Sequence, residues 1–326
     1  MRERRSRVPS CQTKTFMAFG HYYRGMDDKL RIDAEEFQAP LWKLAEAMAE
    51  LVIHEGHKQL PAAYISQDIQ FMIRHAIATY NLLFYLNADE RREQDTSWNY
   101  VYGVAAAPLV RTLIDCLYNI TTILENPAEN GAAYHKSGLR KRLLDIEADQ
   151  EQYGGKREWD DYNARQIAAL RFLIHEDKFT EDDIRTADTW KPMGTYILQG
   201  KKEDATAHQS FLKRFTYLPW KQYSGLSHAS LDGYIGELPA GSYFVMDRMA
   251  REDRENTEKM YVAFLTRHLG RSALVLLCIV TELQLYFRFK GHQIDERILK
   301  MWDAMIGIFE VKEIYDERYE AFLRPR

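Results

Sequence analysis

The 326-residue chain has a formal net charge of −4, and 46% of its residues are hydrophobic and 28% charged. This composition is typical of globular proteins, and the length allows one large domain or two smaller ones. The slight acidic excess argues against a general nucleic-acid-binding protein with a broad basic surface, although a local basic patch is compatible with it.

Helical periodicity dominates the chain. Apolar residues recur at helical spacing and predict helices over residues 34–58, 62–87, 98–125, 128–152, 157–176, 219–234, 256–290, 294–308 and 310–322. We expect residues 177–218 to be less regular, and Pro108 to kink its helix or to mark the true start. The one strand-like stretch is short, at residues 242–246.

These elements predict an all-α fold, an irregular multi-helix bundle with long central helices. Residues 31–326 are expected to form a single all-helical domain, whose weakest internal boundary lies around residues 177–218. Residues 1–30 carry a basic stretch without the apolar region of a signal peptide after it, so they are expected to be a disordered or poorly ordered leader.

The cysteines and the apolar runs predict a soluble cytoplasmic protein. Cys11, Cys116 and Cys278 are odd in number and far apart, which argues against a disulfide framework or a zinc knuckle. We expect Cys116 and Cys278 to be core residues. The longest apolar run, residues 273–280, is far shorter than the roughly 20 residues of a membrane span, so no membrane partner is expected.

The predicted helix 98–125 carries an unusual polar stripe. Arg111, Asp115 and Asn119 are spaced i, i+4 and i+8 in an otherwise apolar sequence. An arginine in such a helix needs a partner, and Asp115 is one turn away. The pair is either a structural ion pair that fixes helix register, or an arrangement in which Asp115 orients Arg111 toward a phosphate or carboxylate.

The second polar stripe lies in residues 219–234. Ser224, His228 and Asp232 share one helical face, but a serine-hydrolase triad is disfavoured, because its groups usually come from separate elements and no nucleophile elbow is present. Two interpretations remain: a helical His–Asp pair with serines on a crowded face, or a His228 that points into a polar pocket and acts as an acid, a base or a hydrogen-bond donor to a bound phosphate.

Other histidines have weaker patterns. Arg171 and His175 are spaced i and i+4, and a solvated helix edge explains them better than an anion groove. His54 and His57 lack the H-E-x-x-H spacing of a zinc site. His268 is expected to be a hydrogen-bonded core residue. No metal site and no cofactor are predicted.

Two motifs resemble a known group of proteins. The stretch Arg111-Thr112-Leu-Ile-Asp115, followed by Tyr223-Ser-Gly-Leu226-Ser227-His228, resembles prokaryotic all-helical proteins of unknown function, some encoded among mobile or defence genes. These proteins are at times compared with HEPN (higher eukaryote and prokaryote nucleotide-binding) bundles. The resemblance covers roughly residues 65–290 and implies a defence-associated effector that binds a nucleotide or RNA.

The chain departs from the HEPN ribonucleases in one respect. Those enzymes have an arginine and a histidine separated by four to six residues, usually in a dimeric composite site. Here Arg171 and His175, and likewise Arg288 and His292, are separated by three. If the site is nevertheless of that type, the resemblance implies His228 as general acid or base and Arg111 as the group that stabilises charge on phosphorus, without metal.

The sequence thus predicts a polar pocket with His228 and Arg111 as catalytic candidates and with ligand-binding candidates Asp115, Asn119, Tyr223 and Ser227. Its expected partners are a phosphate-bearing small molecule or RNA, and a second copy of the chain in a homodimer. The alternative is a non-enzymatic interaction or scaffold protein, in which the same residues form a buried network for helix register.

Overall fold

The computed structural model describes residues 34–88, 97–198, 206–227, 254–290, 293–306 and 309–324. Within these ranges every regular element is a helix, which confirms the all-α fold. The expected basic leader, the strand-like stretch 242–246 and His228 lie outside the described residues.

The chain begins with long helices. In order, the structure has α3 (Ala34–His54), η1 (Gly56–Gln59), α4 (Ala63–Ala88), α6 (Ser97–Glu125), η2 (Pro127–Gly131), α7 (Ala132–Tyr153) and α8 (Arg157–Glu176). Short helices follow: α9 (Glu181–Arg185), α10 (Met193–Leu198), α11 (Ala207–Phe211) and η4 (Leu212–Thr216). The rest comprises α12 (Tyr217–Ser227), α15 (Arg254–Phe287), α16 (Ile294–Met305), α17 (Phe309–Ile314), η5 (Tyr315–Tyr319) and α18 (Glu320–Leu323).

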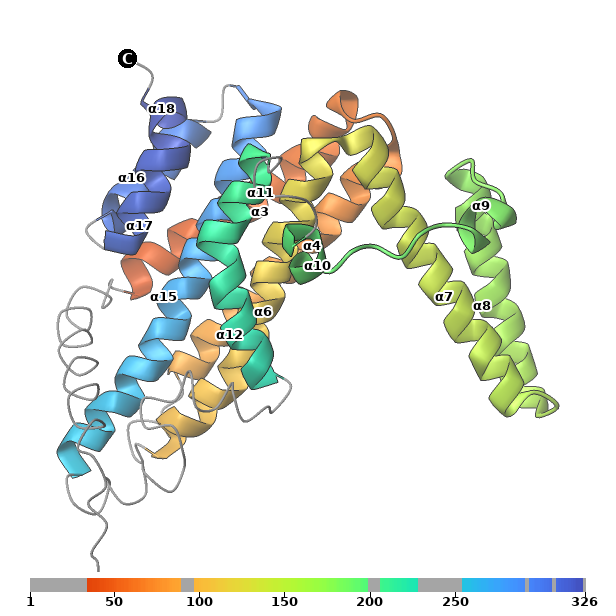
Figure 1. The fold of residues 1–326 in the computed structure, drawn as a ribbon, viewed down its shortest axis with the longest axis horizontal. Coiled ribbons are helices and arrows are strands. Elements are labelled where there is room, and N and C mark those ends of the chain that lie inside the picture. The colour runs from red at the N-terminus through yellow and green to blue at the C-terminus, as the bar shows by residue number, and fades with distance from the viewer. Residues whose placement is uncertain are drawn as a thin grey trace, which may run out of the picture.

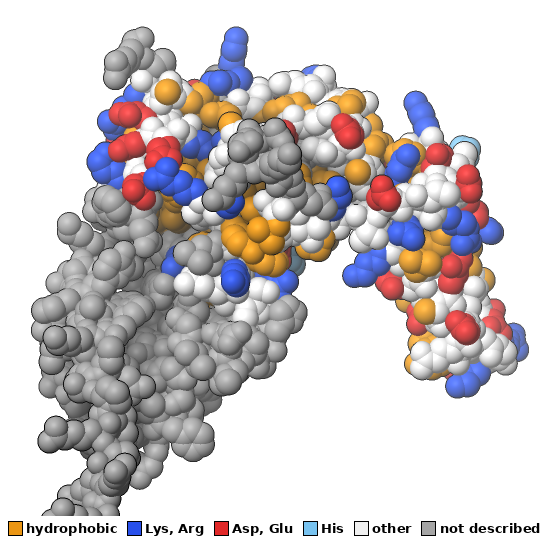
Figure 2. All heavy atoms as spheres, viewed as in Figure 1, with side chains coloured by type: hydrophobic (Ala, Val, Ile, Leu, Met, Phe, Trp, Pro, Cys, Tyr) orange, Lys and Arg blue, Asp and Glu red, His pale blue; other side chains and the backbone are white. Residues whose placement is uncertain are grey.

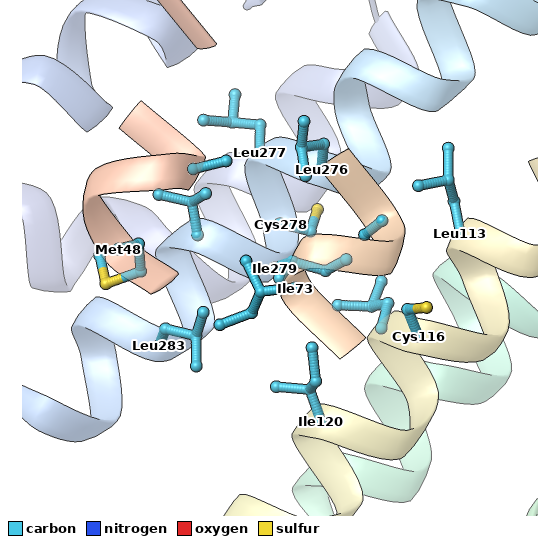
Figure 3. Close-up of a cluster of buried hydrophobic side chains, with 14 of the residues drawn as sticks. Met48, Ile73, Leu113, Cys116, Ile120, Leu276, Leu277, Cys278, Ile279 and Leu283 are labelled. Atoms are coloured by element: carbon cyan, nitrogen blue, oxygen red, sulfur yellow. The ribbon is translucent and has the colours of Figure 1, made fainter. Parts of the chain in front are cut away.

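Helix α15 runs through the centre of the main bundle. It packs against α6, α4 and α3, while α12 lies along α6 (Figure 1). The core between these helices is formed by branched aliphatic side chains and sulfur-containing residues (Figure 3), among them Met48, Ile73, Leu113, Cys116, Leu276 and Cys278. The expectation that Cys116 and Cys278 are core residues is confirmed, because both are buried.

The apolar character of α15 follows from this central position. Among the described residues, the segment His268–Phe287 is long and apolar enough to cross a membrane, with a mean hydropathy of 1.4. In the structure 67% of it is buried, against the neighbouring helices of the bundle. Burial within the protein therefore accounts for its composition without a membrane.

The structure refines two local expectations from the sequence. Pro108 lies inside α6 rather than at its start, and the Thr112 hydroxyl donates to the Pro108 carbonyl at 3.0 Å. Between residues 177 and 218, the described part of the chain holds four short helical segments, α9, α10, α11 and η4, in place of a long helix. Capping boxes at Thr180 and Thr206 begin two of them, because each threonine accepts from the backbone N–H three residues on.

Helices α7 and α8 form a hairpin that extends away from the main bundle (Figure 1). It has a small core of its own, separate from the main one, made of Leu139, Leu143, Ile146, Leu170, Ile174 and Ile184. On its surface, side chains of both charges alternate with apolar ones (Figure 2). At the root of the hairpin, Gly131 lies close to Ile65 of α4. A Cβ added to Gly131 would be only 2.8 Å from Ile65 Cδ1, so only glycine fits this close approach.

Candidate functional site

The polar stripe of α6 meets α12 at Trp220. The Trp220 indole Nε1 donates to Asp115 Oδ1 at 2.7 Å, and the Arg111 guanidinium lies 5.5 Å from the centre of the indole ring. Arg111 Nε also lies 3.7 Å from Asp115 Oδ2. The predicted i, i+4 pair is therefore present, and Trp220, from a helix far away in the sequence, contacts both of its members.

The Asp115 carboxylate is held where its charge is disfavoured. Burial raises the pKa of Asp115, while the hydrogen bond from Trp220 and the nearby Arg111 guanidinium lower it by less. Its side chain keeps 41% exposure and that of Arg111 24%, so the pair lies at the edge of the core rather than within it. Solvent at this edge weakens the ion pair.

One turn further along α12, Tyr223 faces α15 instead. It is fully buried, and its hydroxyl lies 2.8 Å from His268 Nδ1. Arg271 Nη1 donates to the same hydroxyl at 3.3 Å, with its guanidinium 5.4 Å from the tyrosine ring centre. The prediction that His268 is a hydrogen-bonded core residue is confirmed.

The remaining predicted site residues have other partners. Ser227 Oγ donates to the Tyr223 carbonyl at 2.7 Å, within its own helix. Asn119 Oδ1 accepts from Trp190 Nε1 at 2.9 Å and so secures the segment that leads back from the hairpin. The structure thus brings Arg111 and Asp115 together on one side of α12 and Tyr223 on another, while Asn119 serves a separate contact.

A pocket of about 350 Å³ lies between α6, η4, α12, α15 and α17. Its apolar wall is formed by Ile114, Phe215, Pro219, Leu274, Val275 and Ile314. Its polar lining includes Arg214, Gln222, Arg271 and Glu313. Arg214 is half exposed and forms ion pairs with Glu317 at 2.7 Å and Glu313 at 3.8 Å. Two arginines from different helical elements therefore border one partly apolar pocket.

The sequence interpretation did not include these pocket residues. Arg271, like Arg111, is a charged residue within an apolar helical sequence. This pattern could have indicated Arg271 as a candidate site residue. Arg214 and Glu313 are ordinary surface residues by pattern, so only the packing of η4 against α17 shows that they belong to a pocket.

The weaker histidine motifs show no converging site. Arg171 is exposed and pairs with Glu181 at 2.7 Å, as expected for a solvated helix edge. His57 Nδ1 lies 2.7 Å from the Ile53 carbonyl, and His54 lies 3.4 Å from Glu50. Across the described part of the chain, no group of three or more His, Cys, Asp or Glu side chains has an arrangement that would hold a metal ion.

Comparison of the chain with models of protein families, with curated proteins and with solved structures gave no match. The resemblance based on the motifs at Arg111 and Tyr223 therefore stays a prediction.

Proposed function

We propose that this chain is a cytoplasmic helical protein that binds a phosphate-bearing small molecule, a nucleotide by preference, in the pocket between α6, η4, α12, α15 and α17. The observation that carries the proposal is the pair of arginines, Arg214 and Arg271, at one pocket with an apolar wall. A guanidinium grips phosphate oxygens through two parallel N–H bonds, which makes arginine the preferred residue for such ligands.

The rest of the lining favours a nucleotide over a bare phosphate. The pocket volume is at the lower end of the roughly 300–1,000 Å³ that small-molecule sites occupy. Phe215 and the aliphatic wall offer contact to a base, and Gln222 and Glu313 offer acceptors for its amino groups. Glu313 would repel a ligand that carried only negative charge, so a ligand with both a phosphate and hydrogen-bond donors fits better.

Arg111 and Asp115 lie on the same helix as Ile114 but do not themselves line this pocket. Ile114, which lines it, directly precedes Asp115 and lies almost one turn after Arg111. The catalytic role of His228, RNA as a substrate, a defence function and a homodimer remain predictions from the sequence. The binding proposal does not depend on them.

The test is isothermal titration calorimetry of the full chain with nucleoside mono-, di- and triphosphates, inorganic phosphate and a short RNA. We expect Arg214→Gln and Arg271→Lys each to weaken nucleotide binding at least about tenfold, or about 1.4 kcal/mol. Arg271→Lys keeps the charge and so tests the planar fork of the guanidinium. The matched control is Arg171→Gln, an exposed arginine of the hairpin, which should bind as the unmodified protein does.

Circular dichroism confirms that each variant is folded. Unchanged affinity in both pocket variants would contradict the proposal. If inorganic phosphate alone bound as tightly as a nucleotide, the proposed contacts between the apolar wall and the base would contribute nothing to affinity, and the preference for a nucleotide would be wrong.

A scaffold protein is the second candidate, and a specific observation favours it. Asp115 accepts from Trp220, and Tyr223 is fully buried beside His268, so these polar groups find their partners within the protein. This function predicts that no nucleotide or RNA raises the melting temperature, whereas a ligand at 100 times its Kd would stabilise the fold by about 2.7 kcal/mol.

A further inference from the structure

The root of the hairpin contains a histidine between two carboxylates. His135, in the first turn of α7, has Nδ1 2.8 Å from Asp68 Oδ2 and Nε2 2.9 Å from Asp177 Oδ2. Asp68 belongs to α4 of the main bundle, and Asp177 is the residue that caps the end of α8. One imidazole ring therefore connects both helices of the hairpin to the bundle.

The positions of both aspartates are fixed by local structure. Asp68 lies within a long helix, and α8 ends in a Schellman motif, in which Phe179 N donates to the Ile174 carbonyl at 2.9 Å and Lys178 N to the His175 carbonyl at 3.0 Å. Lys178 takes the left-handed conformation that this motif requires, with φ of 62°. The cap holds Asp177 in place against the ring.

Two ionised carboxylates can only accept hydrogen bonds, so both ring nitrogens must donate. A neutral imidazole has a single N–H. The lone pair of its other nitrogen would then point at a carboxylate oxygen, and no hydrogen bond could form there. The contacts therefore require the imidazolium. Because the two carboxylates lie at opposite nitrogens, they do not converge on one point, which sets this cluster apart from a metal site.

The surroundings favour the charged ring. Burial lowers the pKa of His135, but the hydrogen bonds and charges of Asp68 and Asp177 outweigh it, so that its pKa is raised. Tyr64 of α4 stacks on the ring with centroids 4.5 Å apart. Burial, with the two aspartates, raises the pKa of Tyr64, so this phenol stays neutral near pH 7.

Two further titratable groups of α7 lie close by. The Lys136 ammonium is 4.8 Å from the centre of the Phe179 ring, beside the cluster. The pKa of Tyr134 is raised to about 12 by burial and by Asp68, so it is also neutral near pH 7. The change of charge in this range is therefore assigned to the imidazole of His135.

We propose that these three groups form a proton-dependent clamp, which holds the α7–α8 hairpin against α4 when His135 carries both ring protons and releases it when one proton is lost. Since the pKa is higher in the folded protein, the contribution of the clamp is complete below the ordinary histidine value of about 6.5. It is lost as the pH rises through the raised pKa. The hairpin is thereby held firmly against α4 at low pH and more loosely at high pH.

The experiment measures the distance between hairpin and bundle in the full chain. Spin labels are placed at Lys43→Cys on α3 and Glu151→Cys near the hairpin tip, both exposed positions, in a Cys11→Ser background. Cys116 and Cys278 are buried and should not react. Between about pH 5.5 and about pH 8.5, the range of histidine titration, we expect one narrow distance distribution to broaden several-fold.

Variants separate the clamp from general effects of pH. Asp177→Asn should stay narrow at all pH values, because its amide can donate to the unprotonated nitrogen while Asp68 accepts from the other. His135→Gln should be broad throughout. The neighbouring exposed His175→Gln is the control and should follow the unmodified protein. A distribution that does not change with pH in the unmodified chain, or an Asp177→Asn variant that keeps the full response, overturns the proposal.

Discussion

At the scale of single residues, Trp220 organises the junction of three helices. Its Nε1 donates to Asp115 on α6, its ring lies beside the Arg111 guanidinium, and it stacks on Tyr217 with centroids 6.0 Å apart. Its ring edge also packs on Gly194 of α10, where an added Cβ would lie 3.4 Å from the indole. An ion pair within one helix thus becomes a contact between helices through one indole.

Asp115 should matter more as an acceptor than as a charge. We expect Asp115→Ala to lower the free energy of unfolding by about 1–2 kcal/mol, because the Trp220 N–H loses its partner. Asp115→Asn keeps an acceptor and should cost less. The pKa of Asp115 is higher in the folded protein than in the unfolded chain, so the ionised carboxylate lowers the free energy of unfolding at neutral pH. This loss of stability decreases as the pH falls from the folded pKa toward the pKa of the unfolded chain.

Urea unfolding at pH 7 measures both variants of Asp115. Equal losses in Asp115→Asn and Asp115→Ala would show that the charge pair with Arg111 is the main contribution after all.

At the scale of elements, the α7–α8 hairpin carries its own small core and a polar defect within it. Asn163 of α8 is only 1% exposed, and neither amide atom has a hydrogen-bond partner among the described residues. A buried amide without a partner costs stability, because it has lost its hydration without compensation. The hairpin therefore has a position at which an apolar residue should fit better.

We expect Asn163→Leu to raise the free energy of unfolding by about 1 kcal/mol, through loss of the buried amide and gain of apolar contact. The control, Ala164→Leu at the neighbouring exposed position, should change it by less than about 0.5 kcal/mol. Thermal unfolding followed by circular dichroism compares the two. A clear loss of stability in Asn163→Leu would mean that the Asn163 amide forms hydrogen bonds in solution and does not destabilise the hairpin.

At the scale of the whole molecule, a buried carboxylate joins the C-terminal helices to the central one. Glu282 of α15 is 5% exposed and accepts two hydrogen bonds from the Arg318 guanidinium and one from the Tyr319 hydroxyl at 2.8 Å. Burial and this carboxylate also raise the pKa of Tyr319, so its hydroxyl remains a donor. The segment η5–α18 is therefore attached through a charged pair that is shielded from water.

Breaking this pair should destabilise the fold strongly. We expect Glu282→Ala to lower the free energy of unfolding by about 3–5 kcal/mol, because Arg318 keeps a largely buried charge without its partner. The double variant Glu282→Met with Arg318→Met should recover most of that loss, since both charges leave together. Denaturant unfolding of the set checks this. A double variant as unstable as Glu282→Ala would show that Tyr319, rather than the ion pair, dominates.

The helices themselves were predictable from the sequence, because each depends on a local pattern. The boundaries of α8 agree with the prediction, and those of α4 and α6 agree to within a residue, since apolar residues recur every three to four positions. The short helices between residues 177 and 218 were missed. They contain too few turns to show a period, and their capping boxes are their main local signal.

The sequence by itself determined the all-α class, the long central helices and the Arg111–Asp115 pair, because helical periodicity and i, i+4 spacing are local. Only the tertiary structure decided that Trp220 completes this pair, that Asn119 binds Trp190 instead, and that Arg214 and Arg271 border one pocket. These contacts join residues far apart in the chain. They depend on how the helices cross, which is set by packing over the whole core and which no local pattern encodes.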